Sequence, residues 1–180
     1  MKATGIVRRI DDLGRIVIPK EIRRTLRIRE GDPLEIFTDI EGKVILKKYS
    51  PIGELGSLAR IYADSLSKTL DCTVCITDTD QVIAAAGNGK KELQEMLLSA
   101  ELAEVFQERK TVLKKSSDAE FVAITKDRSE YSEEIISVIL SEGDIAGGVI
   151  FLQKNEKKHF GEIEKKFAAG AADLLGRQLS

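Results

Sequence analysis

The pattern of apolar and polar positions divides the chain into two stretches that favour different structures. In the first fifty residues, short apolar runs alternate with turn residues, which is typical of strands joined by tight turns. Gly14 and Gly42 stand where the turns need a residue that tolerates positive φ, and Pro19 stands where a helix can begin. Strands are predicted over residues 4–10, 15–18, 34–38 and 43–48, and a short helix over 20–26.

The second stretch mixes helices and strands. Apolar residues recur every three or four positions over residues 55–70 and again over 159–179, as amphipathic helices require. Further helices are predicted over residues 91–99 and 101–109, and strands over 72–77, 81–86, 111–113, 121–124, 135–141 and 145–153. This order of elements predicts an α+β fold in which helices cover an antiparallel sheet.

A short linker is predicted over residues 51–56, because one proline and two glycines within six residues interrupt regular structure. It separates an N-terminal domain of residues 1–52 from a C-terminal domain of residues 53–180. A unit of about fifty residues without disulfide or metal is near the lower size limit for an independent core. We therefore expect two copies of the N-terminal domain to exchange strands in a dimer.

The charge distribution supports this division. The 180 residues carry a net charge of -2, which by itself argues against a nucleic-acid-binding protein. However, residues 1–50 hold 12 basic and 8 acidic residues, whereas residues 51–180 hold 16 and 22. Seven of the eleven arginines precede position 30. The asymmetry predicts a basic module that meets a polyanion, joined to an acidic module with another task.

The run from Thr4 to Leu26, together with Gly31, Asp32 and the apolar segment 34–36, resembles the AbrB-type swapped-hairpin DNA-binding domain. The resemblance implies an intertwined dimeric β-barrel. It also implies the DNA-contacting residues, which share the guanidinium group that suits phosphates and guanine edges. These residues are Arg8, Arg15, Arg23 and Arg24.

The remainder of the chain resembles the C-terminal part of the stage V sporulation transcription factors, and its element order resembles a GAF domain, a module that senses small molecules. The resemblance implies a sequence-specific transcription factor that activates and represses late sporulation genes by binding double-stranded DNA. The sequence identifies no ligand for the C-terminal domain, and no cofactor is expected.

The terminal helix carries two apolar faces, and we expect one to pack on its own sheet and the other on a partner subunit, giving a homotetramer. The first face contains Phe160, Ile163, Phe167, Ala171 and Leu174. The second face, which has room for a partner, contains Ala168, Leu175 and Leu179.

Two other functions agree less well with the sequence. MazE-like antitoxins share the swapped-hairpin architecture but usually carry a disordered tail, whereas residues 51–180 have the pattern of a folded domain. An enzyme is not expected, because the chain has no Gly-x-Ser-x-Gly motif and His159 is its one histidine.

No metal site is expected either. Cys72 and Cys75 lie on one predicted strand and point to opposite faces, which favours buried structural cysteines over a metal site or a redox pair. Asp78 and Asp80 are expected to form a turn rather than bind a cation. With no apolar run long enough to span a membrane and no secretory signal pattern, the protein is expected in the cytoplasm.

Overall fold

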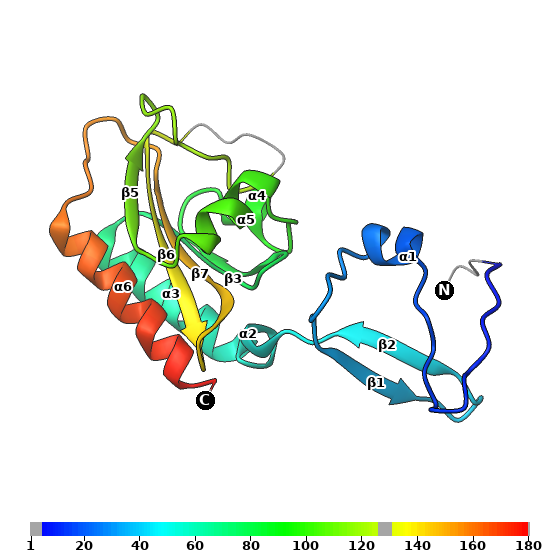
Figure 1. Cartoon of the computed structure of the whole chain (residues 1–180). Coiled ribbons are helices and arrows are strands. Elements are labelled where there is room, and N and C mark those ends of the chain that lie inside the picture. The colour runs from blue at the N-terminus through cyan, green and yellow to red at the C-terminus, as the bar shows by residue number, and fades with distance from the viewer. Residues whose placement is uncertain (1–4, 126–130, 180) are drawn as a thin grey trace. The chain divides into compact units, whose positions relative to one another are not determined.

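The computed structural model describes residues 5–125 and 131–179, so Thr4, the first residue of one predicted strand, lies outside the described residues. The chain forms two compact units, Met1–Tyr49 and Ser50–Ser180. Each unit has its own sheet, as Figure 1 shows.

The first unit contains α1 (Lys20–Thr25) and an antiparallel hairpin of β1 (Leu34–Thr38) and β2 (Val44–Lys48). The hairpin turn is closed by Asp39, whose carboxylate accepts the backbone N–H groups of Glu41 and Lys43. Gly42 takes a φ of +80° in this turn, which glycine adopts without strain. The helix and the second pair of strands are thus where the sequence pattern predicts them.

The prediction of strands over residues 5–10 and 15–18 is wrong for the single chain, in which both segments lack regular structure. The turn between them does form, since the Asp11 carboxylate accepts the backbone N–H groups of Leu13 and Arg15. A strand needs a neighbouring strand for its backbone hydrogen bonds, and the described part of this chain supplies none here. The apolar side chains of both segments are consequently exposed: Ile6, Val7, Ile10, Ile16 and Val17.

The second unit is a five-stranded antiparallel sheet in the order β4-β3-β7-β6-β5. Its strands are β3 (Thr73–Thr77), β4 (Val82–Ala86), β5 (Val112–Lys115), β6 (Glu133–Ser141) and β7 (Asp144–Gln153). Its helices are α2 (Pro51–Glu54), α3 (Gly56–Leu70), α4 (Lys90–Leu93), α5 (Ala100–Gln107) and α6 (Glu162–Arg177). Helices α3 and α6 cover one face of the sheet, and α4 and α5 cover the other (Figure 1).

Each face of the sheet buries its own apolar core, because side chains of a strand alternate between faces. Ile135 of β6 joins the core under α3 and α6, and Ile136 joins the core under α5. Cys72 belongs to the first core and Cys75 to the second, which confirms that the two thiols point to opposite faces. Both are free and buried, and burial raises the pKa of each thiol to about 12. Such thiols are unreactive near neutral pH.

Two further predictions about the second unit are corrected. The expected linker contains helix α2, because Pro51 occupies its first turn and the Ser50 hydroxyl caps it by accepting the N–H of Gly53. Residues 121–124 are not a strand, although Thr125 forms an isolated bridge with Leu98. The N–H of Val122 instead donates to the carboxylate of Glu134, so a side chain takes the place of a strand neighbour.

The assignment of the two faces of α6 is wrong for most of their residues, although Phe160 and Ala171 of the expected inner face are buried. Ala168 and Leu175, which the pattern offered to a partner subunit, are buried against the unit's own sheet. Ile163, Phe167 and Leu174, expected on the inner face, are exposed. Alanines let the helix axis approach the sheet closely, so the face with smaller side chains is the one that packs inside.

The two glycines of α6 provide a matched test of this packing. A Cβ atom at Gly176 would lie 2.1 Å from the Leu140 carbonyl oxygen, whereas a Cβ at Gly170 would meet nothing within 4 Å. We expect Gly176→Ala to lower the free energy of unfolding by about 2 kcal/mol. Gly170→Ala should raise it by roughly 0.5 to 1 kcal/mol, because alanine favours helix. Denaturant unfolding of both variants measures the difference, and equal stabilities would refute the close approach.

Candidate functional site

The four arginines that the sequence points to all lie in the first unit. Arg8 is exposed in the segment that leads into the turn at Asp11, and Arg15 is exposed where the chain leaves it. Arg23 and Arg24 are consecutive residues in the last turn of α1. The structure therefore places one arginine before the turn, one arginine after it, and two on one short helix.

Arg15 is held by an exposed ion pair across the turn. Its Nε lies 2.7 Å from Asp11 Oδ2, and its side chain is 70% exposed. The Arg15 backbone N–H, the Arg15 side chain and the Leu13 N–H together hold the pKa of Asp11 below its ordinary value. An exposed pair of this kind is weak and screened by salt. The guanidinium can therefore exchange the carboxylate for a phosphate at little cost.

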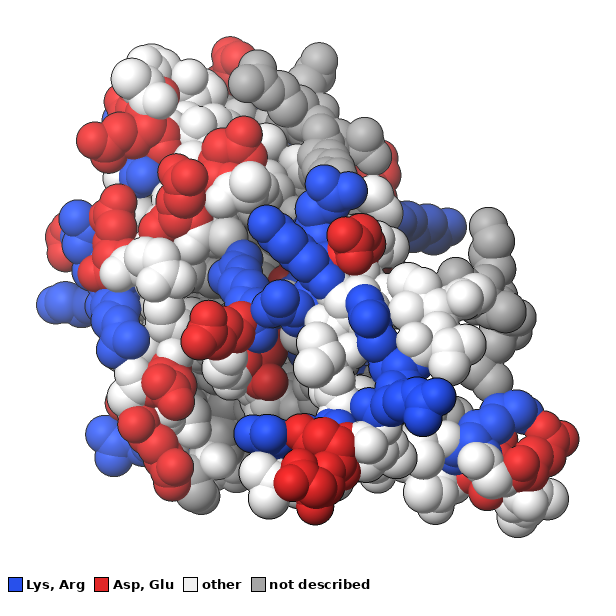
Figure 2. Space-filling view, turned by 45° about the vertical axis from the view of Figure 1, so that its right-hand side comes forward, with Lys and Arg blue, Asp and Glu red and all other residues white. Residues whose placement is uncertain are grey.

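Helix α1 presents its two arginines differently. Arg24 is exposed, whereas Arg23 is partly buried and its Nε has no hydrogen-bond partner among the described residues. The end of the helix is fixed from β2, since Lys48 forms an ion pair with Asp32 at 2.9 Å and donates to the Arg27 carbonyl. Figure 2 shows exposed Lys and Arg side chains, in blue, interspersed with acidic ones, in red. The forked guanidinium donors of exposed arginines suit phosphate oxygens and guanine edges.

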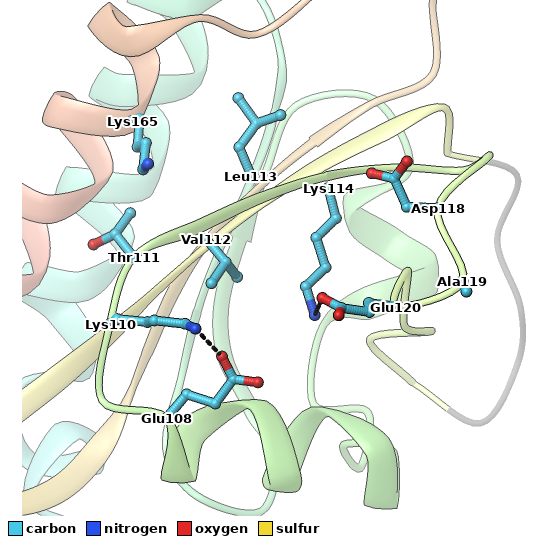
Figure 3. Close-up of a pocket in the computed structure, with 10 residues that line it drawn as sticks. All are labelled: Glu108, Lys110, Thr111, Val112, Leu113, Lys114, Asp118, Ala119, Glu120 and Lys165. Carbon is cyan, nitrogen blue, oxygen red and sulfur yellow. Dashed lines mark ion pairs between the residues drawn. The ribbon is translucent and has the colours of Figure 1, made fainter.

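A pocket of about 630 Å³ lies in the second unit around β5, the strand at one edge of the sheet. Figure 3 shows Lys114 reaching from β5 toward Glu120, with 3.8 Å between Nζ and Oε2. On the same side, Lys110 forms a 2.8 Å ion pair with Glu108. Lys165 of α6 completes the lining from the other side of β5. The lining of the pocket therefore combines basic and acidic side chains with apolar ones such as Val112 and Leu113.

Glu134 of β6 is the direct cross-strand neighbour of Lys114 and is fully buried. Its Oε1 accepts the Val122 N–H at 3.0 Å, and its Oε2 has no hydrogen-bond partner in the described part of the chain. Burial raises the pKa of Glu134 to about 7, against the opposing effects of the Val122 N–H and the Lys114 charge. This carboxyl group therefore changes its charge near neutral pH.

The preceding residue, Glu133, lies on the opposite face of the sheet, and both of its carboxylate oxygens have partners. Its Oε2 accepts the Phe160 N–H at 2.6 Å, and its Oε1 lies 2.7 Å from His159 Nδ1. Glu133 therefore anchors the segment that leads into α6, and the histidine has a structural partner. Neither Lys114 nor Glu134 is among the site residues predicted from the sequence. The pattern that could have identified Glu134 is its spacing of two from Ile136, because residues two apart on a strand face the same side and a buried apolar side implies a buried carboxylate.

The described residues contain no group of three or more His, Cys, Asp and Glu side chains that could hold a metal ion. Within residues 5–125 and 131–179, none of the helices has the length and apolar character needed to cross a membrane.

Comparison with solved structures identifies the fold of the second unit as GAF-like. A GAF domain of the receptor PixJ from Thermosynechococcus elongatus aligns with a TM-score of 0.53 at 14% identity, covering 73% of this chain and 90% of that one. The GAF-B domain of DevS from Mycobacterium smegmatis aligns with a TM-score of 0.56 at 11% identity, covering 72% and 93%. A free methionine-R-sulfoxide reductase from Thermoplasma acidophilum also aligns, with a TM-score of 0.56 at 13% identity, covering 71% and 94%.

The first unit is similar to AbrB. The chain is 67% identical over 51 residues to the transition state regulatory protein AbrB of Bacillus subtilis (strain 168), which covers 28% of this chain and 52% of that protein. Residues 7–54 match the family model of the antidote-toxin recognition protein MazE, a bacterial antitoxin. An AbrB-type N-terminal domain followed by a GAF-like domain defines the class, which is a two-domain transcription regulator.

Residues 54–180 match the family model described as the C-terminal domain of stage V sporulation protein T, a transcription factor. The chain is also 50% identical to stage V sporulation protein T of Bacillus subtilis (strain 168) over an alignment of 183 residues that covers 99% of each chain. The chain therefore belongs to the stage V sporulation protein T family.

The buried carboxyl group of Glu134 predicts a specific dependence of stability on pH. Because its pKa is raised from 4.5 to about 7, the folded chain keeps this proton while the unfolded chain loses it. The free energy of unfolding should therefore fall as pH rises between about 4.5 and 7. Glu134→Gln should remove this loss and be more stable than wild type at pH 8, by on the order of 2 kcal/mol, but not at pH 4.

Chemical denaturation at both pH values measures the difference. Glu101→Gln, which changes an exposed carboxylate of α5, is the control and should follow the wild-type profile. An identical pH profile for wild type and Glu134→Gln would show that the carboxyl group is not desolvated.

Proposed function

We propose that this protein is a sequence-specific DNA-binding transcription factor that activates and represses late sporulation genes. The observation that carries the proposal is 50% identity to stage V sporulation protein T over essentially the whole of both chains. We assign DNA binding to residues 1–52 and sensing and oligomerisation to residues 53–180. The partner is double-stranded DNA, which places the protein in the cytoplasm, and no membrane partner is proposed.

The N-terminal domain works as an intertwined dimer in this proposal. The support is the exposure of its apolar side chains, because Val7 is 88% exposed and Val17 72% exposed in the single chain. A second copy that pairs its strands with residues 5–18 would satisfy the backbone groups and bury these side chains. Two-fold assembly also doubles the number of arginines offered to the DNA.

The DNA contacts are assigned to Arg8, Arg15, Arg23 and Arg24. Their support is their position in the basic unit, the weak ion pair that holds Arg15, and the similarity of this stretch to AbrB. The MazE match of residues 7–54 also favours a second candidate, an antitoxin that binds a protein through the same fold. The folded unit that follows, which matches a transcription-factor family, makes that candidate the weaker one.

The C-terminal domain joins two dimers into a tetramer in this proposal and responds to a small molecule. The exposed face of α6, formed by Ile163, Phe167 and Leu174, supports an interface because these apolar side chains follow one another at helical spacing. No catalytic activity is proposed. The methionine sulfoxide reductase resembles this chain at 13% identity, which concerns the fold alone.

Replacing any one of the four arginines by alanine should weaken DNA binding by about tenfold, because each loses a guanidinium contact in both protomers. The logarithm of the binding constant should also fall less steeply with the logarithm of salt concentration, by roughly two units of slope per variant dimer. Fluorescence anisotropy with a duplex selected from a random library measures both quantities.

The control for these variants is Arg60→Ala, which removes an exposed arginine from α3 and should leave affinity and salt slope unchanged. Wild-type affinity in all four single variants at one salt concentration would remove the assignment of the DNA contacts. Thermal unfolding of each variant shows whether the domain remains folded.

The two faces of α6 should respond differently to a charge. Phe167→Glu should give a folded protein that sediments as a dimer and binds DNA more weakly, because the charge opposes burial at the interface. Ala168→Glu, one residue further, should melt the C-terminal domain, because this position is fully buried against the sheet. Sedimentation velocity and circular dichroism separate these results. A wild-type protein that is dimeric at micromolar concentration would contradict the tetramer.

A further inference from the structure

Two buried groups of opposite charge lie side by side in the second unit without satisfying each other. Lys114 and Glu134 are direct cross-strand neighbours, with 6% and 0% of their surfaces exposed. The ion pair of the Lys114 ammonium is with Glu120 at 3.8 Å, which is too long for a hydrogen bond. Glu134 Oε2 has no partner among the described residues. Buried polar groups normally have hydrogen-bond partners, so the unsatisfied oxygen of Glu134 and the long ion pair of Lys114 make this part of the sheet a candidate binding site.

The pocket around β5 gives a small molecule access to Lys114. Its volume of about 630 Å³ lies within the usual range for ligand sites. Two acidic residues of its lining already have close partners, because Glu108 pairs with Lys110 and Asp118 accepts the Lys115 N–H at 2.7 Å. The buried ammonium of Lys114 is therefore the charge best placed to bind an anion that enters (Figure 3).

The central part of the sheet leaves less room on this face. Phe106 of α5 is buried against Gly148 of β7, where an added Cβ atom would lie 2.7 Å from the ring. Leu102 and Ile150 are fully buried in the same core. A ligand is thus better accommodated at the β5 edge, where Lys114 lies, than under the middle of α5.

We propose that the β5 pocket binds a small carboxylic acid through the Lys114 ammonium, and that the charge of Glu134, the cross-strand neighbour behind Lys114, controls this binding. The ligand carboxylate accepts a hydrogen bond from Lys114 in place of the long ion pair with Glu120. This inference rests on the sensing role proposed above and names the chemical class of the ligand. A phosphate dianion would bring more negative charge against Glu134 and is disfavoured.

The protonation of Glu134 makes binding depend on pH. Among the described residues, the charged group next to Glu134 is Lys114 on β5. Glu120, on the segment after β5, lies beyond Lys114. Because the pKa of Glu134 is about 7, its acid form predominates at pH 6 and its ionised form at pH 8. The ionised form attracts the Lys114 ammonium and repels the ligand carboxylate, so affinity should fall about tenfold between these pH values.

Thermal unfolding of the full-length protein at pH 6 tests the site with acetate, succinate and glutamate as probes. Sodium chloride at the same ionic strength is the reference. At least one carboxylate should raise the Tm of the C-terminal domain by about 3 °C when it saturates the site. Lys114→Gln and Lys114→Met should abolish the shift, and Lys114→Arg should retain it.

Lys115→Gln is the matched control. Lys115 is the next residue of the same strand, but it faces away from Lys114 and lies 3.8 Å from Glu133. This variant should respond to the carboxylate as wild type does. Because Glu134→Gln is neutral at both pH values, calorimetry should show that it retains affinity at pH 6 and loses the difference between pH 6 and pH 8.

Three outcomes would overturn the proposal: no shift with any of the three carboxylates, an undiminished shift in both Lys114→Gln and Lys114→Met, or a Lys114-dependent shift with inorganic phosphate alone. DNA binding is measured on the same samples. Intact DNA binding without carboxylate binding would refute the ligand site and leave the DNA-binding function standing. Carboxylate binding together with wild-type DNA affinity in all four arginine variants would leave the ligand site standing and refute the assignment of the DNA contacts.

Discussion

The pairing of β6 with β7 is the constraint on which the second unit depends. The two strands pair from Glu133 opposite Gln153 to Ser141 opposite Asp144, and both of their faces are buried along most of this length. Because both faces of this hairpin carry apolar side chains, helices must cover both: α3 and α6 lie on one side, and α4 and α5 lie on the other. The glycines at 147 and 148 let β3 and Phe106 approach the hairpin closely. The remaining elements are arranged around this pair.

The same burial gives two consecutive glutamates opposite roles. Glu133 faces the α6 side, where a backbone N–H and a histidine ring satisfy both of its oxygens. Glu134 faces the α5 side, where one oxygen is satisfied and the other is not. A satisfied buried carboxylate stabilises the fold, whereas an incompletely satisfied one costs stability. Its cross-strand neighbour Lys114 lines the β5 pocket, so this cost falls beside the proposed ligand site.

The first unit follows a different principle, because its core is incomplete within one chain. Its helix and hairpin form locally, held by Asp39 at the hairpin turn and by Lys48 at the end of α1. Residues 5–18 have no strand neighbour in the described chain and leave their apolar side chains exposed. This incomplete core is the reason for the dimer proposed for the N-terminal unit. The C-terminal unit, by contrast, has an apolar core on each face of its own sheet.

Local patterns in the sequence were sufficient for most elements of the fold. Apolar spacing located α1, α3, α5, α6 and the central strands, because a strand or helix is recognised from residues a few positions apart. Alternation along one strand also placed Cys72 and Cys75 on opposite faces. The charge asymmetry and the AbrB-like run placed the four candidate arginines in one small unit. The role of those arginines in DNA binding stays a prediction.

Contacts between residues far apart in the sequence decided the rest. Periodicity shows that α6 has two apolar faces, but only the fit of Ala168 and Leu175 against the sheet decides which face is inside. Strand propensity over residues 5–18 cannot produce a strand without a neighbour. Similarly, Lys114 and Glu134 are ordinary charged residues in the sequence, and only the register of β5 against β6 brings them together and buries them. The sequence by itself determined local conformation, whereas burial and its electrostatic consequences depend on partners that only the tertiary structure supplies.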